Sequence, residues 1–271
     1  MTDEQKTTAK EQPPINTEWD YFFAALMFYT RLPAPANTRH SPEILNGSRK
    51  YFPLIGIIIA SIGAIVFLVS QSFLPIGISV ALSMVATILA TGAFHEDGFA
   101  DSCDGLGGGW KKEQVLTIMK DSRVGTYATV GLVSILAVKF LSLNELATLS
   151  VTAFVFCLIA AHTFSRLCAS FVIESYEYVQ DIDASKAKPM TQASLSSQDK
   201  HATFIIAALP ILILAFFALI PTLVALLVST ITATLFANYS EKRIGGYTGD
   251  ILGAIQQLSE VAFYLTFLAM L

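Results

Sequence analysis

The chain has 271 residues, of which 54% are hydrophobic and 14% charged, and its mean hydropathy is +0.59. This composition excludes an ordinary soluble domain and indicates an integral membrane protein with several spans. The formal net charge of −4 excludes little, because the positions of the charges matter more than their sum in such a protein. The three cysteines, Cys103, Cys157 and Cys168, lack a CxxC spacing, which argues against a disulfide framework and against a zinc site.

The chain begins with 18 polar residues that include two prolines, which predict a flexible tail and not a signal peptide. Residues 19–30 are aromatic and apolar but cover only about half of the 20 residues that a membrane span needs, so we expect a helix in the interface or against the bundle. Seven longer apolar stretches predict transmembrane helices in a single membrane-embedded domain, 19–271. They are 54–74, 77–94, 125–143, 146–171, 203–220, 222–238 and 251–271. The predicted fold class is therefore an all-α polytopic helix bundle.

Seven crossings place the connecting segments alternately on the two sides of the membrane. One side receives the tail and residues 31–53, 95–124, 172–202 and 239–250, which together hold 15 of the 17 lysines and arginines. The short connections 75–76, 144–145 and 221 hold none; Lys139, near a predicted span end, and Arg166, inside the fourth span, are the exceptions. The positive-inside rule then predicts that the long loops are cytoplasmic and that the C-terminus is outside.

The segment FHEDGFADSCDGLGGG, residues 94–109, concentrates four carboxylates, one histidine and a glycine-rich end directly after an apolar run. If the segment is helical, Asp97, Asp101 and Asp104 follow at i, i+4 and i+7 and share one face, where their repulsion favours a bound cation. Hard divalent cations prefer such oxygen ligands. The glycines that follow, which include Gly107 and Gly108, would either cap the helix or let backbone amides approach a phosphate.

Three further groups of residues carry possible chemistry. Lys120 and Arg123, with Asp121 between them, stand before the third span and either anchor it or bind phosphate oxygens. His162 and Arg166 are four residues apart in the fourth span, where Arg166 would either extend toward the cytoplasmic side or contact a substrate phosphate.

The last group comes near the C-terminus. RIGGYTGDILGAIQQLSE, residues 243–260, repeats the glycine and acid theme at Asp250 and continues with Gln257 and Glu260 near the same helical face. Ionisable groups inside a span are costly and usually functional, although a structural hydrogen bond between helices is the alternative. Residues 174–202 form a long polar loop that fits a lid, a binding loop or a disordered segment.

Carboxylates that gather Mg²⁺, adjacent glycines and nearby cations suit phosphoryl or nucleotidyl transfer, and the missing GxxxxGK[ST] pattern excludes a P-loop ATPase. The strings HEDGFADSCDGLGGG, MKDSRVGTYA and GGYTGDILGAIQQLSE, together with YFPLIG at 51–56, resemble the cobalamin synthase family of bacteria, the adenosylcobinamide-GDP ribazoletransferases. The resemblance covers residues 50–270 or nearly the whole chain. It implies that α-ribazole, or its 5′-phosphate, attacks the cobinamide-linked phosphate of adenosylcobinamide-GDP and that GMP leaves.

The resemblance also implies Mg²⁺ as cofactor, the bacterial inner membrane as location and the lipid bilayer as surroundings, without a nucleic-acid partner. A homo-oligomer, or a complex with other enzymes of the cobalamin pathway, is compatible with it. The family's acidic motif falls on His95, Asp97, Asp101 and Asp104, and its TGD motif on residues 248–250. We expect Asp97, Asp101, Asp104 and Asp250 to hold Mg²⁺, Asp104 or His95 to act as base, and Lys120, Arg123, Gly107, Gly108 and Arg166 to contact substrate.

Two other functions remain possible at this point. A CDP-alcohol phosphotransferase of phospholipid synthesis shares the beginning of the acidic motif, but Asp101 stands where that family has arginine and the later spacing differs. A cation transporter would use His162, Glu260 and Asp97 as an ion path, yet the acids cluster at the cytoplasmic edge of the predicted bundle. Both are weaker than the ribazoletransferase prediction.

Overall fold

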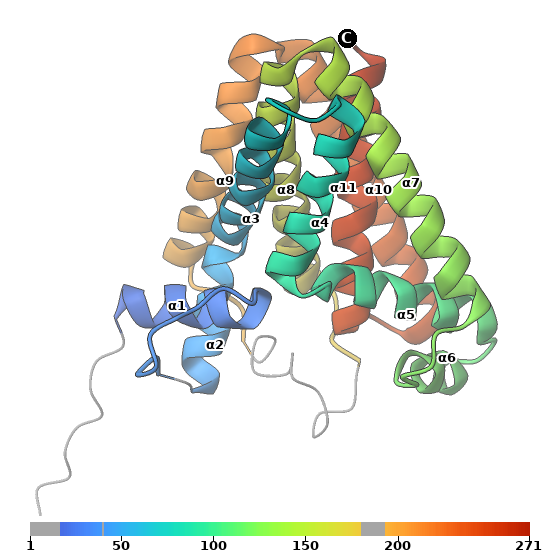
Figure 1. Cartoon of the computed structure of the whole chain (residues 1–271). Helices are drawn as coiled ribbons and strands as arrows, with labels where there is room; N and C mark the ends of the chain where they lie inside the picture. The colour runs from blue at the N-terminus through green and yellow to red at the C-terminus, as the bar shows by residue number, and fades with distance from the viewer. Residues whose placement is uncertain (1–16, 40, 180–192) are drawn as a thin grey trace, which may run out of the picture.

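The computed structural model describes residues 17–39, 41–179 and 193–271, which form a bundle of long helices with shorter helices across one end (Figure 1). The long helices are α3 (Phe52–Ser70), α4 (Ile76–Thr91), α7 (Thr126–Leu149), α8 (Val151–Ser175), α9 (Ser197–Phe217), α10 (Leu219–Ile244) and α11 (Gly249–Ala269). The short helices are α1 (Glu18–Tyr29), α2 (Pro42–Ser48), the 3-10 turn η1 (Arg49–Tyr51), α5 (Phe94–Gly108) and α6 (Lys112–Met119). The predicted all-α membrane bundle is confirmed.

Six of the long segments in the described part of the chain are long and apolar enough to cross a membrane, and α4 with α5 passes the same test as a pair bent by 87°. We count α4 as the seventh span and α5 as a helix that lies across the bundle end, so each predicted span has its helix. Several bounds differ from the prediction. Helix α7 continues through Asn144 to Leu149, α8 begins at Val151, and α9 begins at Ser197. Helix α10 begins at Leu219, because Pro221 then sits in its first turn, where proline is tolerated, and it ends at Ile244.

The N-terminal boundary also differs slightly. Thr17 and Glu18 belong to the predicted tail, but Thr17 caps α1, since its side chain accepts from the amide of Asp20, and Glu18 is the first helical residue. The rest of the predicted tail, residues 1–16, lies outside the described residues. Helix α1 runs across the lower end of α3 (Figure 1), as expected for the short aromatic segment.

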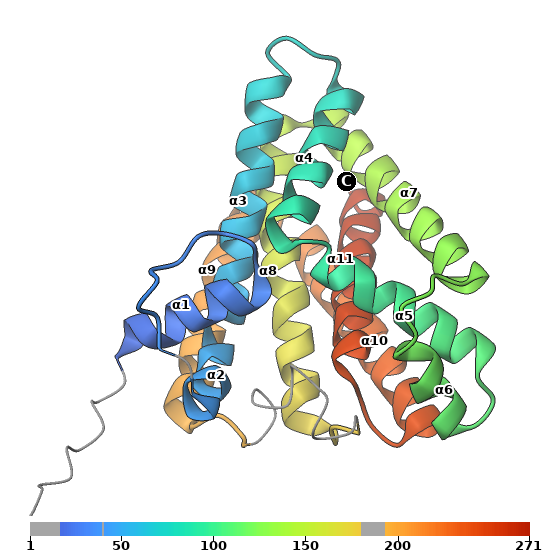
Figure 2. The ribbon, with the colours of Figure 1, turned by 60° about the horizontal axis from the view of Figure 1, so that its bottom comes forward.

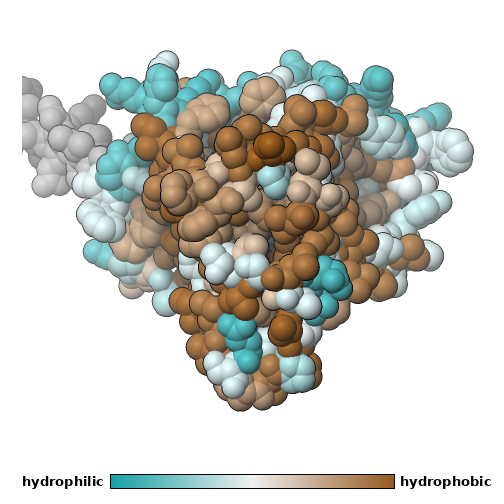
Figure 3. Space-filling model, turned by 90° about the horizontal axis from the view of Figure 1, so that it is seen from above, coloured by the Kyte–Doolittle hydropathy of each residue, from teal (hydrophilic) through white to brown (hydrophobic). Residues whose placement is uncertain are grey.

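The short helices and the longer connections gather at one end of the bundle, and the short connections at the other, where the C-terminus also lies (Figure 1). Seen from that second end, the surface is mainly hydrophobic, and hydrophilic side chains gather at its outer edge (Figure 3). Large apolar side chains such as Phe216, Leu212 and Ile205 are exposed along α9, as expected of helices that face lipid. The arrangement agrees with the segregation of charge in the sequence.

The core has two parts. Near the C-terminal end, Phe67, Phe154, Leu143 and Tyr264 are fully buried among α3, α7, α8 and α11. Near the opposite end, α1, α3 and α11 pack together, and the rings of Tyr29 and Phe52 stack with centroids 4.1 Å apart. Between these two apolar parts the bundle interior is polar.

Candidate functional site

The acidic motif forms α5, which leaves the lower end of α4 and crosses α11 toward the start of α7 (Figure 2). Gly92 and Ala93 make the bend with φ angles of 67° and 57°, a left-handed conformation that glycine adopts without a steric cost. The amide of Arg31 donates to the carbonyl of Ala90 at 2.7 Å and so satisfies the end of α4. After this bend the chain leaves the apolar span α4 and continues as α5, which carries the acidic motif across the end of the bundle.

Close backbone packing fixes the distance between α5 and α11. A Cβ atom at Gly98 would lie 3.0 Å from both Cα and the carbonyl oxygen of Asp250, and one at Gly253 would lie 3.0 Å from the carbonyl oxygen of His95. Only glycine fits such a crossing without displacing backbone. Asp250, in the first turn of α11, is thereby brought against α5.

The predicted carboxylate face of α5 exists. Asp97 is exposed, and Asp101 and Asp104 are half-buried, whereas His95, Glu96, Phe99 and Ser102 are buried on the other side. Burial, followed by the charges of Asp250, Asp97 and Asp104, raises the pKa of Asp101 to about 7. This mutual influence places the four predicted metal ligands in one neighbourhood, which we call the acidic cluster: Asp97, Asp101, Asp104 and Asp250.

The acidic cluster is not a preformed metal cage. Among the described residues, no three His, Cys, Asp or Glu side chains converge closely enough to hold a metal ion. Mg²⁺ does not require such a cage, because it usually keeps several waters and binds one or two carboxylates together with substrate phosphates. The donor set, which consists only of carboxylate oxygens, suits that ion.

Asp104 has a structural partner that the sequence did not indicate. Its carboxylate oxygens accept hydrogen bonds from the amides of Gly125 at 2.6 Å and Ala128 at 2.9 Å. These amides begin α7 and would otherwise lack acceptors. Asp104 therefore joins α5 to α7. These contacts give no support to its predicted roles as metal ligand and base.

His95 lies on the face of α5 opposite to the carboxylates. Its side chain is buried, and its ring stacks on Phe52 with centroids 6.0 Å apart. Burial, and secondarily Arg166, lowers the pKa of His95 well below its ordinary value, so the ring is neutral at pH 7. This geometry gives no support to His95 as the base of a reaction at the acidic cluster.

Arg166 differs most from its prediction. It is 1% exposed inside the bundle, where its Nη1 donates to the carbonyl of His162 at 2.8 Å and lies 3.3 Å from His162 Nδ1. The bundle encloses this side chain, so the structure does not show the expected extension toward the cytoplasmic side. A direct contact between Arg166 and a substrate phosphate has no support in this geometry.

The two cations predicted to bind phosphate in segment 120–123 lie at the surface, unlike the buried Arg166. Lys120 is exposed, and Arg123, 88% exposed, pairs with Asp121 through a bond of 2.5 Å between Nη2 and Oδ2. That pair lowers the pKa of Asp121 to about 2. Because Gly125 is bound by Asp104, this segment lies beside the outer end of α5, and Lys120 and Arg123 are exposed to solvent there.

The glycine-rich end of α5 packs against its neighbours. A Cβ at Gly107 would meet the Tyr127 ring at 2.7 Å, whereas one at Gly108 would only touch Ile118 at 3.5 Å. Both glycines are exposed. The contact of both glycines with phosphate stays a prediction. Close packing against Tyr127 explains why a glycine stands at position 107.

Sequence reasoning missed the function of Arg243. Its guanidinium donates to the carbonyls of Leu106 at 3.1 Å and Gly109 at 2.5 Å, which satisfies carbonyl groups at the C-terminal end of α5. A basic residue two positions before Gly245 was visible in the sequence, but its partners on and beside α5 lie more than a hundred residues away. Arg243 fixes the far end of α5 as Asp250 fixes its middle.

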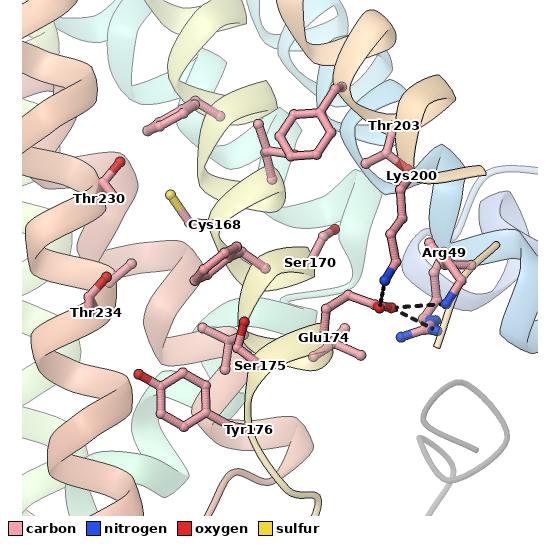
Figure 4. A pocket seen from close by; sticks show the side chains of 18 residues that line it. Arg49, Cys168, Ser170, Glu174, Ser175, Tyr176, Lys200, Thr203, Thr230 and Thr234 are labelled. Atoms are coloured by element: carbon pink, nitrogen blue, oxygen red, sulfur yellow. Dashed lines mark hydrogen bonds and ion pairs between the residues drawn. The ribbon is translucent and has the colours of Figure 1, made fainter. Parts of the chain in front are cut away.

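A cavity of about 500 Å³ forms a groove between α8, α9 and α10 and contains no residue of the acidic cluster. Figure 4 shows Glu174 at its polar end between Arg49 and Lys200, and Cys168, Thr230 and Thr234 on the other side. Glu174 pairs with Arg49 at 3.2 Å and with Lys200 at 2.7 Å. Glu174 and Lys200, near the two ends of the long polar loop predicted at 174–202, line this groove. Residues 180–192 of that loop lie outside the described part of the chain, so the choice between a lid, a binding loop and a disordered segment stays open.

With this geometry established, comparisons with known proteins are informative. The family model described as cobalamin-5-phosphate synthase matches residues 21–268. The chain belongs to this family. The adenosylcobinamide-GDP ribazoletransferase of Shewanella frigidimarina (strain NCIMB 400) is 45% identical over 248 residues, which cover 92% of this chain and 94% of that protein.

A second relative gives the same result. The adenosylcobinamide-GDP ribazoletransferase of Shewanella amazonensis (strain ATCC BAA-1098 / SB2B) is 41% identical over 251 residues, 93% of this chain and 95% of its own length. No solved structure matches the chain. The family resemblance read from the three motifs is confirmed, and the phospholipid and transporter alternatives are not favoured.

Proposed function

We propose that the chain joins adenosylcobinamide-GDP to α-ribazole, or to α-ribazole 5′-phosphate, with release of GMP. Family membership over residues 21–268 supports this reaction. The observation that carries the proposal is the carboxylate face of α5 turned toward Asp250 at one end of a membrane bundle. A diphosphate substrate needs a divalent cation and fixed cations nearby, and this end of the bundle offers both kinds of group.

The proposed Mg²⁺ ligands are Asp97, Asp101 and Asp250. We assign Asp104 to holding the start of α7, because two backbone amides occupy its carboxylate. When bound, Mg²⁺ would neutralise the diphosphate and stabilise the leaving GMP. Burial and the neighbouring carboxylates raise the pKa of Asp101, and this repulsion is the physical reason for a cation at the site.

The remaining residues would bind and orient the substrates. Lys120 and Arg123 are exposed beside the acidic cluster and are proposed to contact the diphosphate oxygens, Arg123 in exchange for its bond to Asp121. The 5′-hydroxyl oxygen of α-ribazole forms a bond to the cobinamide-linked phosphorus, the bond from that phosphorus to the GMP oxygen breaks, and the hydroxyl proton passes to a carboxylate of the cluster. The backbone amides of Gly107 and Gly108 are proposed to contact the substrate phosphates as well.

The proposed location is the bacterial inner membrane with the acidic cluster on the cytoplasmic side. The segregation of 15 of 17 lysines and arginines to the segments at one end supports this orientation. The substrates are nucleotides and therefore reach the protein from the cytoplasm. We make no proposal for a homo-oligomer or a complex with other pathway enzymes.

The test is direct. Purified protein in liposomes receives adenosylcobinamide-GDP, α-ribazole and Mg²⁺, and GMP and cobalamin are measured. We expect both products in equal amounts, and we expect Asp97→Asn to reduce turnover by about 10²-fold or more, because a metal ligand is lost. Glu113→Gln, an exposed carboxylate on α6, is the matched control and should keep wild-type turnover.

Two results would count against the proposal. If the protein releases CMP from a CDP-alcohol and an acceptor but makes no cobalamin, the reaction belongs to phospholipid synthesis. If Asp97→Asn turns over at the wild-type rate, the assignment of the metal is wrong even though the reaction is right.

A further inference from the structure

The buried side of α5 is polar where a membrane bundle is expected to be apolar. Glu96, 9% exposed, accepts a hydrogen bond at 3.0 Å from Nε2 of Gln257, which is 2% exposed on α11. Gln257 Nε2 also donates to Gln256 Oε1 at 2.9 Å. The residue before Asp97 is thus bound to the helix that carries Asp250.

This contact is the edge of a larger network. Gln256 donates to Ser165 of α8 at 3.1 Å and to Glu260. Glu260 is fully buried and pairs with Lys139 of α7 at 2.5 Å and with His162 at 3.3 Å. With Arg166, the network contains two cations and two carboxylates, so its formal charges cancel across α5, α7, α8 and α11.

Five polar atoms at this network have no hydrogen-bond partner among the described residues: His95 Nε2, Glu96 Oε2, His162 Nε2, Arg166 Nε and Gln257 Oε1. All five residues line one small cavity of about 10 Å³. That volume is at the lower limit for a single water, which needs two to four polar partners. A buried water would join the inner side of α5 to α8 and α11 and would satisfy groups whose burial is otherwise costly.

The position of Glu96 determines the direction of Asp97. Successive residues of a helix are about 100° apart, so a helix that holds Glu96 inward turns Asp97 and Asp101 outward. Close packing at Gly98 fixes how near α5 lies to α11 but leaves its rotation less constrained, because glycine has no side chain to interlock. The hydrogen bond from Gln257 constrains the rotation on the side of α11, as the bonds to Asp104 do on the side of α7.

We propose that Gln257 and Glu96, with one buried water, form a polar clamp that sets the rotation of α5 and so orients the acidic cluster for its metal. Gln257 and Glu96 are positioning residues, and neither is a ligand. The inference rests on the proposed role of the cluster as a Mg²⁺ site. Residues that orient metal ligands typically change metal affinity by 10–100-fold when they are replaced.

The test measures metal binding in the absence of substrate. Mn²⁺ replaces Mg²⁺, and its binding to the purified protein in detergent is followed by electron paramagnetic resonance. Gln257→Met keeps the side-chain length but removes the donor, and we expect it to weaken Mn²⁺ binding by about tenfold. Glu96→Met should weaken it similarly, and the double variant should be no weaker than either single one, because the pair acts as a unit.

Two further variants separate orientation from general destabilisation. Glu96→Gln keeps an acceptor for Gln257 and should bind Mn²⁺ within about twofold of the wild type. Thr222→Val removes a fully buried hydroxyl that donates only within α10 and should leave Mn²⁺ binding unchanged. Thermal unfolding in the same detergent shows that each variant is folded.

Undiminished Mn²⁺ binding by folded Gln257→Met overturns the clamp alone. Additive losses in the double variant also overturn it, since they show that the two residues act separately. If the wild-type protein binds no Mn²⁺, the metal role in the proposed function fails together with the clamp.

Discussion

Asp101 in α5 has a carboxyl group whose ionisation responds strongly to its surroundings. Half-buried and surrounded by three other carboxylates, it has a pKa raised to about 7. The protonated form is therefore favoured in the folded protein below that pH, and the ionised form that a metal needs becomes dominant above it. The carboxylate of Asp104, by comparison, accepts hydrogen bonds from the amides of Gly125 and Ala128.

We expect metal binding to strengthen as the pH rises through 7. Between pH 6 and pH 8 the ionised fraction of a group with a pKa of about 7 increases about tenfold, so the Mn²⁺ dissociation constant should fall by about that factor. The measurement is a Mn²⁺ titration of the purified protein at several pH values. Asp101→Asn should bind more weakly with a flatter pH profile, and an unchanged slope in this variant would contradict the assignment.

Helix α5 is held by the bend at its start and by contacts from distant parts of the chain. The bend at Gly92 starts it, and Gly98 packs closely on α11. Asp104 accepts from amides at the start of α7, and Arg243 binds the carbonyls at the far end of α5. These contacts involve different elements, so α5 has a fixed position. This rigidity keeps the carboxylates of α5 near Asp250.

Gly98→Ala should separate α5 from α11. The added Cβ would lie 3.0 Å from backbone atoms of Asp250, which cannot move aside as a flexible side chain can. We expect a loss of about 1–3 kcal/mol in the free energy of unfolding and about a tenfold loss of turnover from misplaced groups. Turnover is measured in liposomes and unfolding in detergent.

The matched control for Gly98→Ala is Gly77→Ala in α4, where the added Cβ meets side-chain atoms alone, Oδ1 of Asn144 at 3.2 Å and the Phe140 ring at 3.8 Å. It should change both quantities little. Wild-type turnover in Gly98→Ala would show that the close crossing is not needed for the site.

At the scale of the whole molecule, the bundle interior combines apolar ends with a charged centre. Lys139, His162, Arg166 and Glu260 lie 0–3% exposed among α7, α8 and α11. Ions at such depth persist only when they are paired and hydrogen-bonded. The bundle therefore depends on complete pairing at its centre as well as on packing of Phe67 and its neighbours.

Glu260→Ala should destabilise the bundle by about 3–5 kcal/mol, because Lys139 would remain buried without its partner. Thermal unfolding in detergent measures this loss. The double variant Lys139→Met with Glu260→Met should recover part of it, since both buried charges are removed. A double variant less stable than Glu260→Ala would contradict a pairing role.

The sequence by itself determined the helical membrane class, the seven spans and the charge asymmetry between the two ends. These properties follow from local composition and periodicity, which a linear chain displays directly. The family rested instead on the resemblance of particular motifs. The carboxylate face of α5 was also predictable, because Asp97, Asp101 and Asp104 repeat with the period of one helix.

Only the tertiary structure decided what the other polar residues do. Arg166 became part of an internal network, Asp104 was bound by the start of α7, and Lys139 was deep in α7 because that helix continued through Asn144. Arg243 and Gln257 gained partners on α5 that are more than a hundred residues away. Such pairings depend on the bend at Gly92 and on which helices meet, and neither follows from the spacing of residues along the chain.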